Sequence, residues 1–156
     1  SGSTTPKRRS MPSSSSLAAV LSIIGAVVLA VAPVFADEAQ DEKAAKRAKV
    51  CAKADERYAE LYPGAENDGV TVVKLYKYHF CPGSLTVQVG TTVRWINVDK
   101  RTSHSVWLKE AKVDESERFF PEEQWDFSFQ AAGNYPYLCG PHWEKEDMLG
   151  TVTVIE

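Results

Sequence analysis

Four residues with metal-binding side chains constrain the fold of this chain more than any other feature. His104 lies 35 residues before Cys139, and His142 and Met148 follow that cysteine at short spacing. One thiolate, two imidazoles and one thioether form the ligand set of a mononuclear copper site, because sulfur and imidazole donors hold copper in both oxidation states. The fold must therefore bring two distant segments of the chain to one point.

The Cys139-x-x-His142 spacing places two of these ligands in one tight turn. Gly140 gives that turn backbone freedom, and Pro141 removes a competing backbone donor directly before the histidine. Cys-x-x-His alone is equally typical of half a zinc site. Strand-like sequence on both sides of the turn favours the copper interpretation, in which the loop leaves one strand, surrounds the ion and rejoins the next.

From residue 70 onward the sequence is typical of β-structure. Short runs rich in β-branched and aromatic residues alternate with Gly, Pro, Asn and Asp, which is the pattern of strands separated by turns. Residues 98–103 would form the loop that delivers His104, and the polar stretch 110–123 would contain a helical turn. The strand-like runs predict an all-β, Greek-key sandwich; they are residues 70–78, 84–89, 91–97, 105–109, 126–130, 135–138 and 150–155.

The first 36 residues have the features of a signal peptide. A basic segment at residues 7–9 precedes an apolar stretch at 17–34, and small residues before position 37 predict cleavage after Ala36. The alternative is a retained membrane anchor, because the apolar stretch is close to the ~20 residues that span a bilayer. We therefore expect a periplasmic protein that touches the membrane only through this segment, if the segment is not cleaved.

The charge of the chain argues against nucleic acid as a partner. The full chain has 18 basic and 21 acidic residues, and removal of residues 1–36 takes away three basic residues, which changes the net charge from −3 to −6. Nucleic-acid-binding domains carry a basic surface instead. An acidic surface suits copper ions and a basic redox protein.

Residues 37–69 are predicted to form a helical extension and a linker ahead of the β-domain. Residues 37–62 are rich in Ala, Lys, Glu and Asp, and Pro63 and Gly64 then provide a helix stop signal. One face of this helix carries an apolar stripe that is expected to pack on the sandwich; it consists of Cys51, Ala54, Tyr58 and Leu61.

Residues 70–155 resemble the cupredoxin family, the small copper proteins of the plastocyanin and azurin type. The resemblance implies a cupredoxin domain at 70–156 that binds one type 1 copper ion. More narrowly, the chain resembles the periplasmic copper-tolerance cupredoxins of bacteria, in some of which the copper site is green. The resemblance is carried by the loop with Cys139, His142 and Met148, and by Phe80-Cys81-Pro82, 84–90, 91–97, His104-Ser105-Val106 and 133–137.

Two positions depart from the family pattern. The gap between His142 and Met148, the expected axial ligand, is one residue longer than in plastocyanin. Of the four expected ligands, Met148 is therefore the one whose position departs from the family pattern. Ser105 follows the upstream histidine, where plastocyanin and azurin carry Asn. The connection between this segment and the cysteine loop must therefore be made differently.

Cys51, Cys81 and His79 remain after the four copper ligands are assigned. In an oxidising compartment the two cysteines would form a disulfide that ties the helix to the first strands, and the alternative is two separately buried thiols. His79 is either an ordinary exposed or hydrogen-bonded histidine or part of a second, surface copper site assisted by carboxylates. The resemblance to copper-tolerance proteins allows the second interpretation.

Two function classes fit these features. One is a soluble electron carrier, in which His142 conducts electrons between copper and periplasmic redox partners. The other is a copper-tolerance protein that binds excess Cu(I). The sequence leaves open whether such a protein also oxidises Cu(I). The helical extension, the acidic surface and the narrower resemblance favour copper tolerance. An enzyme with an open substrate position is not expected, because four ligands would fill the site.

Overall fold

The computed structural model describes residues 2, 35–65 and 69–156. The predicted signal segment therefore lies outside the described residues, except for Gly2 and the first two positions of a helix that begins at Phe35. Within the described ranges, neither helix has the length and apolar character that crossing a membrane requires.

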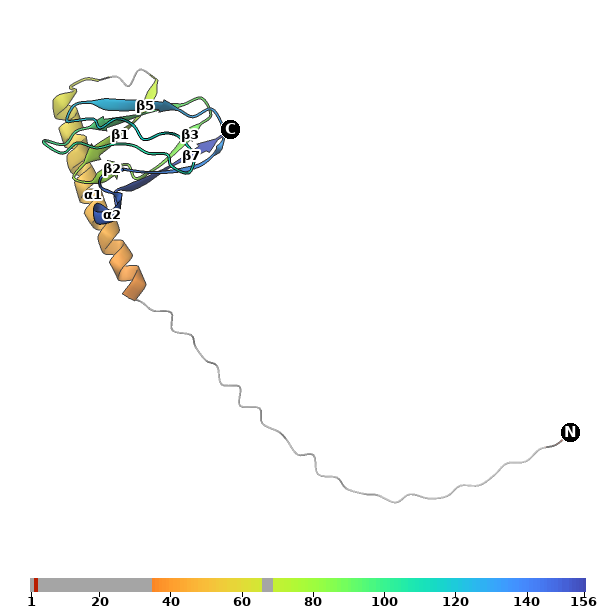
Figure 1. Ribbon diagram of the computed structural model, residues 1–156. Helices are drawn as coiled ribbons and strands as arrows, with labels where there is room; N and C mark the ends of the chain where they lie inside the picture. The colour runs from red at the N-terminus through yellow and green to blue at the C-terminus, as the bar shows by residue number, and fades with distance from the viewer. Residues whose placement is uncertain (1, 3–34, 66–68) are drawn as a thin grey trace. The chain divides into compact units, whose positions relative to one another are not determined.

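The β-domain is a sandwich of two sheets (Figure 1). Its strands are β1 (Val70–Tyr76), β2 (His79–Cys81), β3 (Ser84–Gln88), β4 (Thr92–Asn97), β5 (Gln124–Ser128), β6 (Gly133–Leu138) and β7 (Leu149–Ile155). One sheet has the order β2-β1-β4-β5 and the other β3-β7-β6. The pairs β1–β4 and β3–β7 are parallel, and the other neighbours are antiparallel. The predicted all-β sandwich is confirmed.

Alternation along the strands places one large aromatic core between the sheets. In β7, residues 150, 152 and 154 are buried, while both end residues of the strand are exposed, as a half-buried strand requires. Trp95 of β4 is fully buried at the centre of this core, with its ring centroid 5.3 Å from that of Tyr137 and 5.4 Å from that of Trp125. The ligand residue Cys139 belongs to the same core cluster, so the packing that holds the sheets together also surrounds the candidate site.

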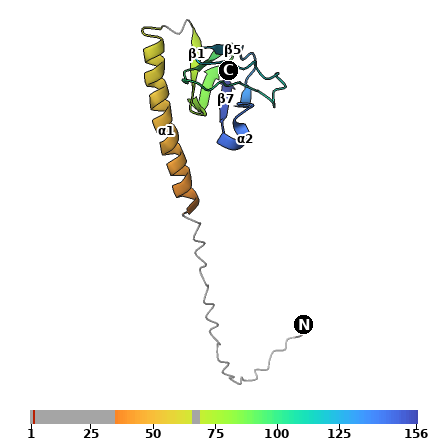
Figure 2. The ribbon, with the colours of Figure 1, turned by 60° about the vertical axis from the view of Figure 1, so that its left-hand side comes forward.

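Helix α1 (Phe35–Leu61) covers the outer face of the first sheet and lies against β1 and β2 (Figure 2). Ala54 is fully buried in a second apolar cluster, which contains Ile96 of β4 and which Tyr58 and Leu61 flank. This contact explains why β4 is buried on both faces near its end. The predicted helix and its apolar stripe are confirmed, and a disulfide joins Cys51 to Cys81 across a Cα–Cα distance of 5.3 Å.

Three local predictions differ from the structure. The predicted strand 105–109 is wrong, because this segment makes only one isolated bridge, from Trp107 to Leu138, and His104 directly before it makes another, to Phe119. Strand β2 was not predicted, since three residues are too few for a visible alternation. The stretch 110–123 contains turns and no helix, whereas a short helix, α2 (Trp143–Glu146), follows His142 in the ligand loop.

Candidate metal centre

Each candidate ligand stands at or near the end of a secondary-structure element. His104 lies in the long connection between β4 and β5, and Cys139 directly follows β6. His142 precedes α2, and Met148 directly precedes β7. Three of the four residues therefore lie in the loop between β6 and β7, and the β4–β5 connection supplies His104.

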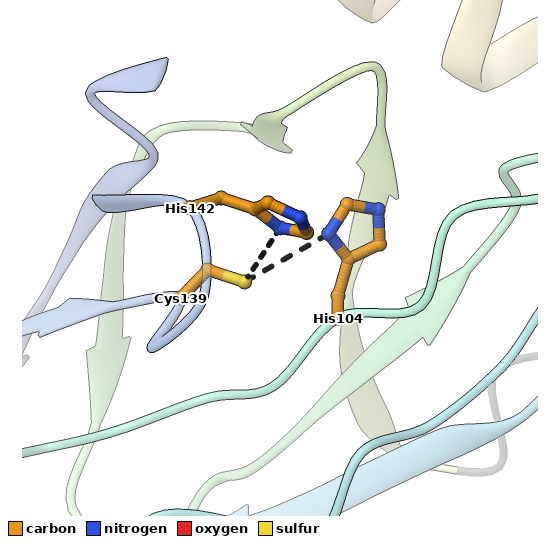
Figure 3. A group of neighbouring side chains, drawn as sticks. All are labelled: His104, Cys139 and His142. Atoms are coloured by element: carbon orange, nitrogen blue, oxygen red, sulfur yellow. Dashed lines mark hydrogen bonds between the residues drawn. The ribbon is translucent and has the colours of Figure 1, made fainter. Parts of the chain in front are cut away.

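The structure brings three of the four side chains together (Figure 3). The ligand atoms of His104, Cys139 and His142 lie within 4.8 Å of one another, and no other group of three or more His, Cys, Asp or Glu side chains in the described part of the chain could hold a metal. Cys139 Sγ lies 3.3 Å from Nδ1 of His142 and 3.8 Å from Nδ1 of His104. One thiol and two imidazole nitrogens thus face a common point.

Backbone hydrogen bonds fix the ligand loop on both sides of the cysteine. The Cys139 N–H donates to the Met148 carbonyl at 3.1 Å, which closes the loop where it enters β7. The His142 and Trp143 N–H groups both donate to the Cys139 carbonyl, at 3.0 and 2.9 Å. Backbone hydrogen bonds therefore hold the shape of the loop around the ligand side chains.

Burial differs among the three ligands. His104 and Cys139 are fully buried, whereas His142 is only partly buried. Tyr78 covers part of the site, since its ring centroid lies 4.9 Å from that of His142 and 6.4 Å from that of His104. Tyr78 and its neighbour Lys77 form the turn between β1 and β2 with φ angles of 61° and 43°, a left-handed conformation that costs about 1 kcal/mol or more per residue without glycine.

Asp99 orients His104. Its Oδ2 lies 3.3 Å from His104 Nε2 and also accepts the Lys77 N–H at 2.9 Å. Burial alone would raise the pKa of Asp99, but the hydrogen bonds from His104 and from the backbone N–H groups of Lys77 and Lys100 outweigh it and hold the pKa below its usual value. With Nε2 donating to this carboxylate, the Nδ1 lone pair is left to face Cys139, which is the arrangement of a metal-ligating histidine.

The protonation chemistry of the other two ligands suits a metal. Burial raises the pKa of the Cys139 thiol, and the hydrogen bonds from Ser105 only partly offset this effect. Burial also lowers the pKa of His142, and the nearby His104 ring and Arg118 guanidinium act in the same direction. The imidazole is thus neutral and ready to bind, whereas the thiol needs a cation to become a thiolate.

Met148 and His79 have different surroundings. Met148 is fully buried in the same core cluster as Cys139, and its role as axial ligand stays a prediction. His79 opens β2, and its Nδ1 lies 2.7 Å from the Lys77 carbonyl oxygen. The structure gathers no second metal-binding group around it within the described residues, so the second copper site gains no support.

Sequence reasoning did not identify Asp99 or Tyr78. Asp99 lies in the loop that was predicted to deliver His104, and a carboxylate five residues before a ligand histidine is the one signal that pointed to it. Tyr78 gave no signal, because its approach to the imidazoles depends on the turn between β1 and β2.

The family model for copper binding proteins of the plastocyanin/azurin family matches residues 67–155. The chain belongs to this family. It is a cupredoxin, and type 1 copper is the cofactor of this family; the thiol and two imidazoles described above fit that metal. Helix α1 lies outside the matched segment.

Individual relatives agree with this assignment. The cupredoxin is 33% identical over 85 residues to plastocyanin from Scenedesmus fuscus, across 48% of this chain and 85% of that protein. It is 34% identical over 79 residues to amicyanin from Paracoccus denitrificans, across 48% of this chain and 60% of that protein. Among solved structures, an oxidised amicyanin variant matches with a TM-score of 0.51 at 32% identity, across 58% of this chain and 86% of that one. A Cu(I) amicyanin variant matches with the same score and identity, across 56% and 84%.

Proposed function

We propose that this cupredoxin is a soluble electron carrier that holds one type 1 copper ion through His104, Cys139 and His142, with Met148 as the weak axial ligand. Copper bound by such a set exchanges one electron as it passes between Cu(I) and Cu(II). The proposal is supported by the donor set, by its burial and by the Asp99 hydrogen bond that orients His104. A ligand loop fixed by its own backbone would change little in shape when the metal changes charge.

The difference in burial among the ligands carries the proposal. His104 and Cys139 are fully buried, so they keep water and competing ligands from the metal. His142 is only partly buried and is followed by Trp143, which is 38% exposed. An electron would therefore pass between the copper and a redox partner through the His142 imidazole, where a partner can approach within a short distance.

Copper tolerance is the alternative, and it was favoured by the sequence. The relatives described above are plastocyanin and amicyanin, and the similar amicyanin structures include oxidised, reduced and Cu(I) forms. A second copper site at His79 would have favoured copper handling, and the surroundings of His79 give it no support. We therefore prefer electron transfer to copper tolerance as the proposed function.

We also propose that the protein is exported to the periplasm after removal of residues 1–36. The Cys51–Cys81 disulfide supports this location, because structural disulfides persist in oxidising compartments. The predicted boundaries, a helical extension at 37–69 and a cupredoxin domain at 70–156, remain part of the same proposal.

Addition of Cu(II) to the purified apo-protein tests the copper site. An intense visible thiolate-to-copper band should appear, should bleach on reduction and should return on oxidation. Cys139→Ser should abolish the band, and His79→Ala should keep it as a matched control. A colourless copper adduct of the intact protein would contradict the proposal.

A deletion strain then separates the two functions. An electron carrier predicts a defect in a respiratory or photosynthetic pathway at ordinary copper levels, with normal growth in added copper. Sensitivity to added copper without any electron-transfer defect would instead favour copper tolerance as the function.

A further inference from the structure

Ser105 joins the two segments that carry the copper ligands. Its Oγ accepts the Gly140 N–H at 3.0 Å, and its backbone N–H donates to Cys139 Sγ at 3.5 Å. Ser105 is fully buried and directly follows His104. A single residue thus connects the His104 segment to both the sulfur and the residue after it, at the position where plastocyanin and azurin carry Asn.

The Ser105 hydroxyl proton is directed to a carboxylate outside the ligand set. Ser105 Oγ lies 2.5 Å from Glu115 Oε1, which is the short distance of a hydroxyl that donates to a charged oxygen. Because the hydroxyl donates to Glu115, its lone pairs are free to accept the Gly140 N–H. Glu115 therefore determines which way the hydroxyl points.

Glu115 is itself held in place by the neighbouring residue. The Val106 N–H donates to Ser116 Oγ at 2.9 Å, and the Ser116 N–H donates to the Val106 carbonyl at 2.9 Å. These two bonds fix the 115–116 segment beside the segment that follows His104. The fold thus holds the backbone of Glu115 at a place from which its side chain reaches Ser105.

Gly140 makes room for this carboxylate. A Cβ atom at position 140 would lie 2.0 Å from Glu115 Oε1. Gly140 does not have a positive φ angle, so the space that the carboxylate needs explains the glycine. The expectation from the sequence that this position needs backbone freedom is therefore corrected. The obstructing atom is the end of a flexible side chain, so an alanine at 140 would displace the Glu115 carboxylate.

We infer that Glu115 is a positioning residue of the copper centre, which acts through Ser105 to tie the Cys139 loop to the His104 segment and to lower the reduction potential of the metal. The inference rests on the proposed copper site. A carboxylate two hydrogen bonds from the thiolate favours Cu(II), the more positive form. Since Glu115 is exposed, water screens its charge and the effect on the potential is modest and dependent on salt.

The test compares four variants of the copper-loaded protein by potential, visible band and rate of copper loss to a chelator. Glu115→Gln keeps an acceptor for Ser105 but removes the charge, and should raise the potential, more at low salt than at high salt. Ser105→Ala should weaken copper binding by roughly ten- to hundred-fold, as loss of a partner outside the ligand set commonly does. Glu117→Gln is the matched control, because it removes the same charge from the same loop without a described bond to Ser105.

Gly140→Ala provides an independent route to the same loss. It should raise the potential as Glu115→Gln does. The double variant Glu115→Gln/Gly140→Ala should raise the potential by less than the sum of the two single shifts, because both changes remove the same interaction. Additive shifts, or a Glu115→Gln potential equal to that of the wild type or of Glu117→Gln, would overturn the inference while the copper site stands. If the wild type forms no coloured site, the proposed function fails as well.

Discussion

Removal of the Cys51–Cys81 disulfide should cost the apo-protein about 3.6 kcal/mol. The two cysteines are separated by 30 residues, and a cross-link that closes a loop of about 30 residues removes that free energy of chain entropy from the unfolded state at 25 °C. Helix α1 should still dock, since its contact through the buried Ala54 is unaffected. The copper band should also be unchanged, because the ligands lie in the sandwich and not in α1.

Thermal unfolding of apo Cys51→Ala/Cys81→Ala, compared with the wild type, measures this cost. A loss of this size lowers Tm by on the order of 10 °C for a domain of this length. Cys139→Ser, which keeps the disulfide, is the control. Thiol titration of the denatured, unreduced wild type should count one free sulfhydryl, that of Cys139. Three free thiols, or a loss below about 1 kcal/mol, would refute the reasoning.

Two further predictions concern the ligand loop. Met148→Leu should keep the colour but raise the reduction potential, because a weak axial donor stabilises Cu(II); an unchanged spectrum and potential would mean that another group occupies the axial position. In the apo-protein, burial raises the pKa of Cys139, so the folded state keeps a proton that the unfolded chain releases. Stability should be fully present below about pH 8.5 and should fall as the pH rises further, and chemical denaturation at a series of pH values should show that Cys139→Ser lacks this loss.

The sequence predicted the elements whose signals are local. The two-residue alternation in β7 and the stripe that contains Ala54 both follow from periodicity, and both were found. The ligand residues could be predicted because thiol and imidazole side chains at this spacing are typical of metal sites. The three that face one another do so because the ends of β6 and the long β4–β5 connection meet at one edge of the sandwich.

Features that depend on contacts between distant segments could not be predicted. Residues 105–109 have the composition of a strand, but within them only Trp107 makes a bridge, to Leu138, while the preceding His104 is bridged to Phe119 on the other side. Glu115 stands in a charged stretch that has no periodicity, and only its position against Ser105 gives it significance. The unusual residue after His104 showed that a different connection was needed, but not which residue made it.

The turn between β1 and β2 has a consequence for attempts to stabilise this protein. Lys77 and Tyr78 both adopt backbone angles that glycine adopts without strain. A screen that selects for heat resistance should therefore accept Gly at position 77, where the exchange leaves the Tyr78 ring in place. At position 78 the exchange would remove a ring that packs against the hydrophobic core and against the His142 imidazole, and the loss of this packing outweighs the relief of backbone strain. The strain at Tyr78 is thus kept by the same packing that covers the site, whereas the strain at Lys77 can be removed without loss to the site.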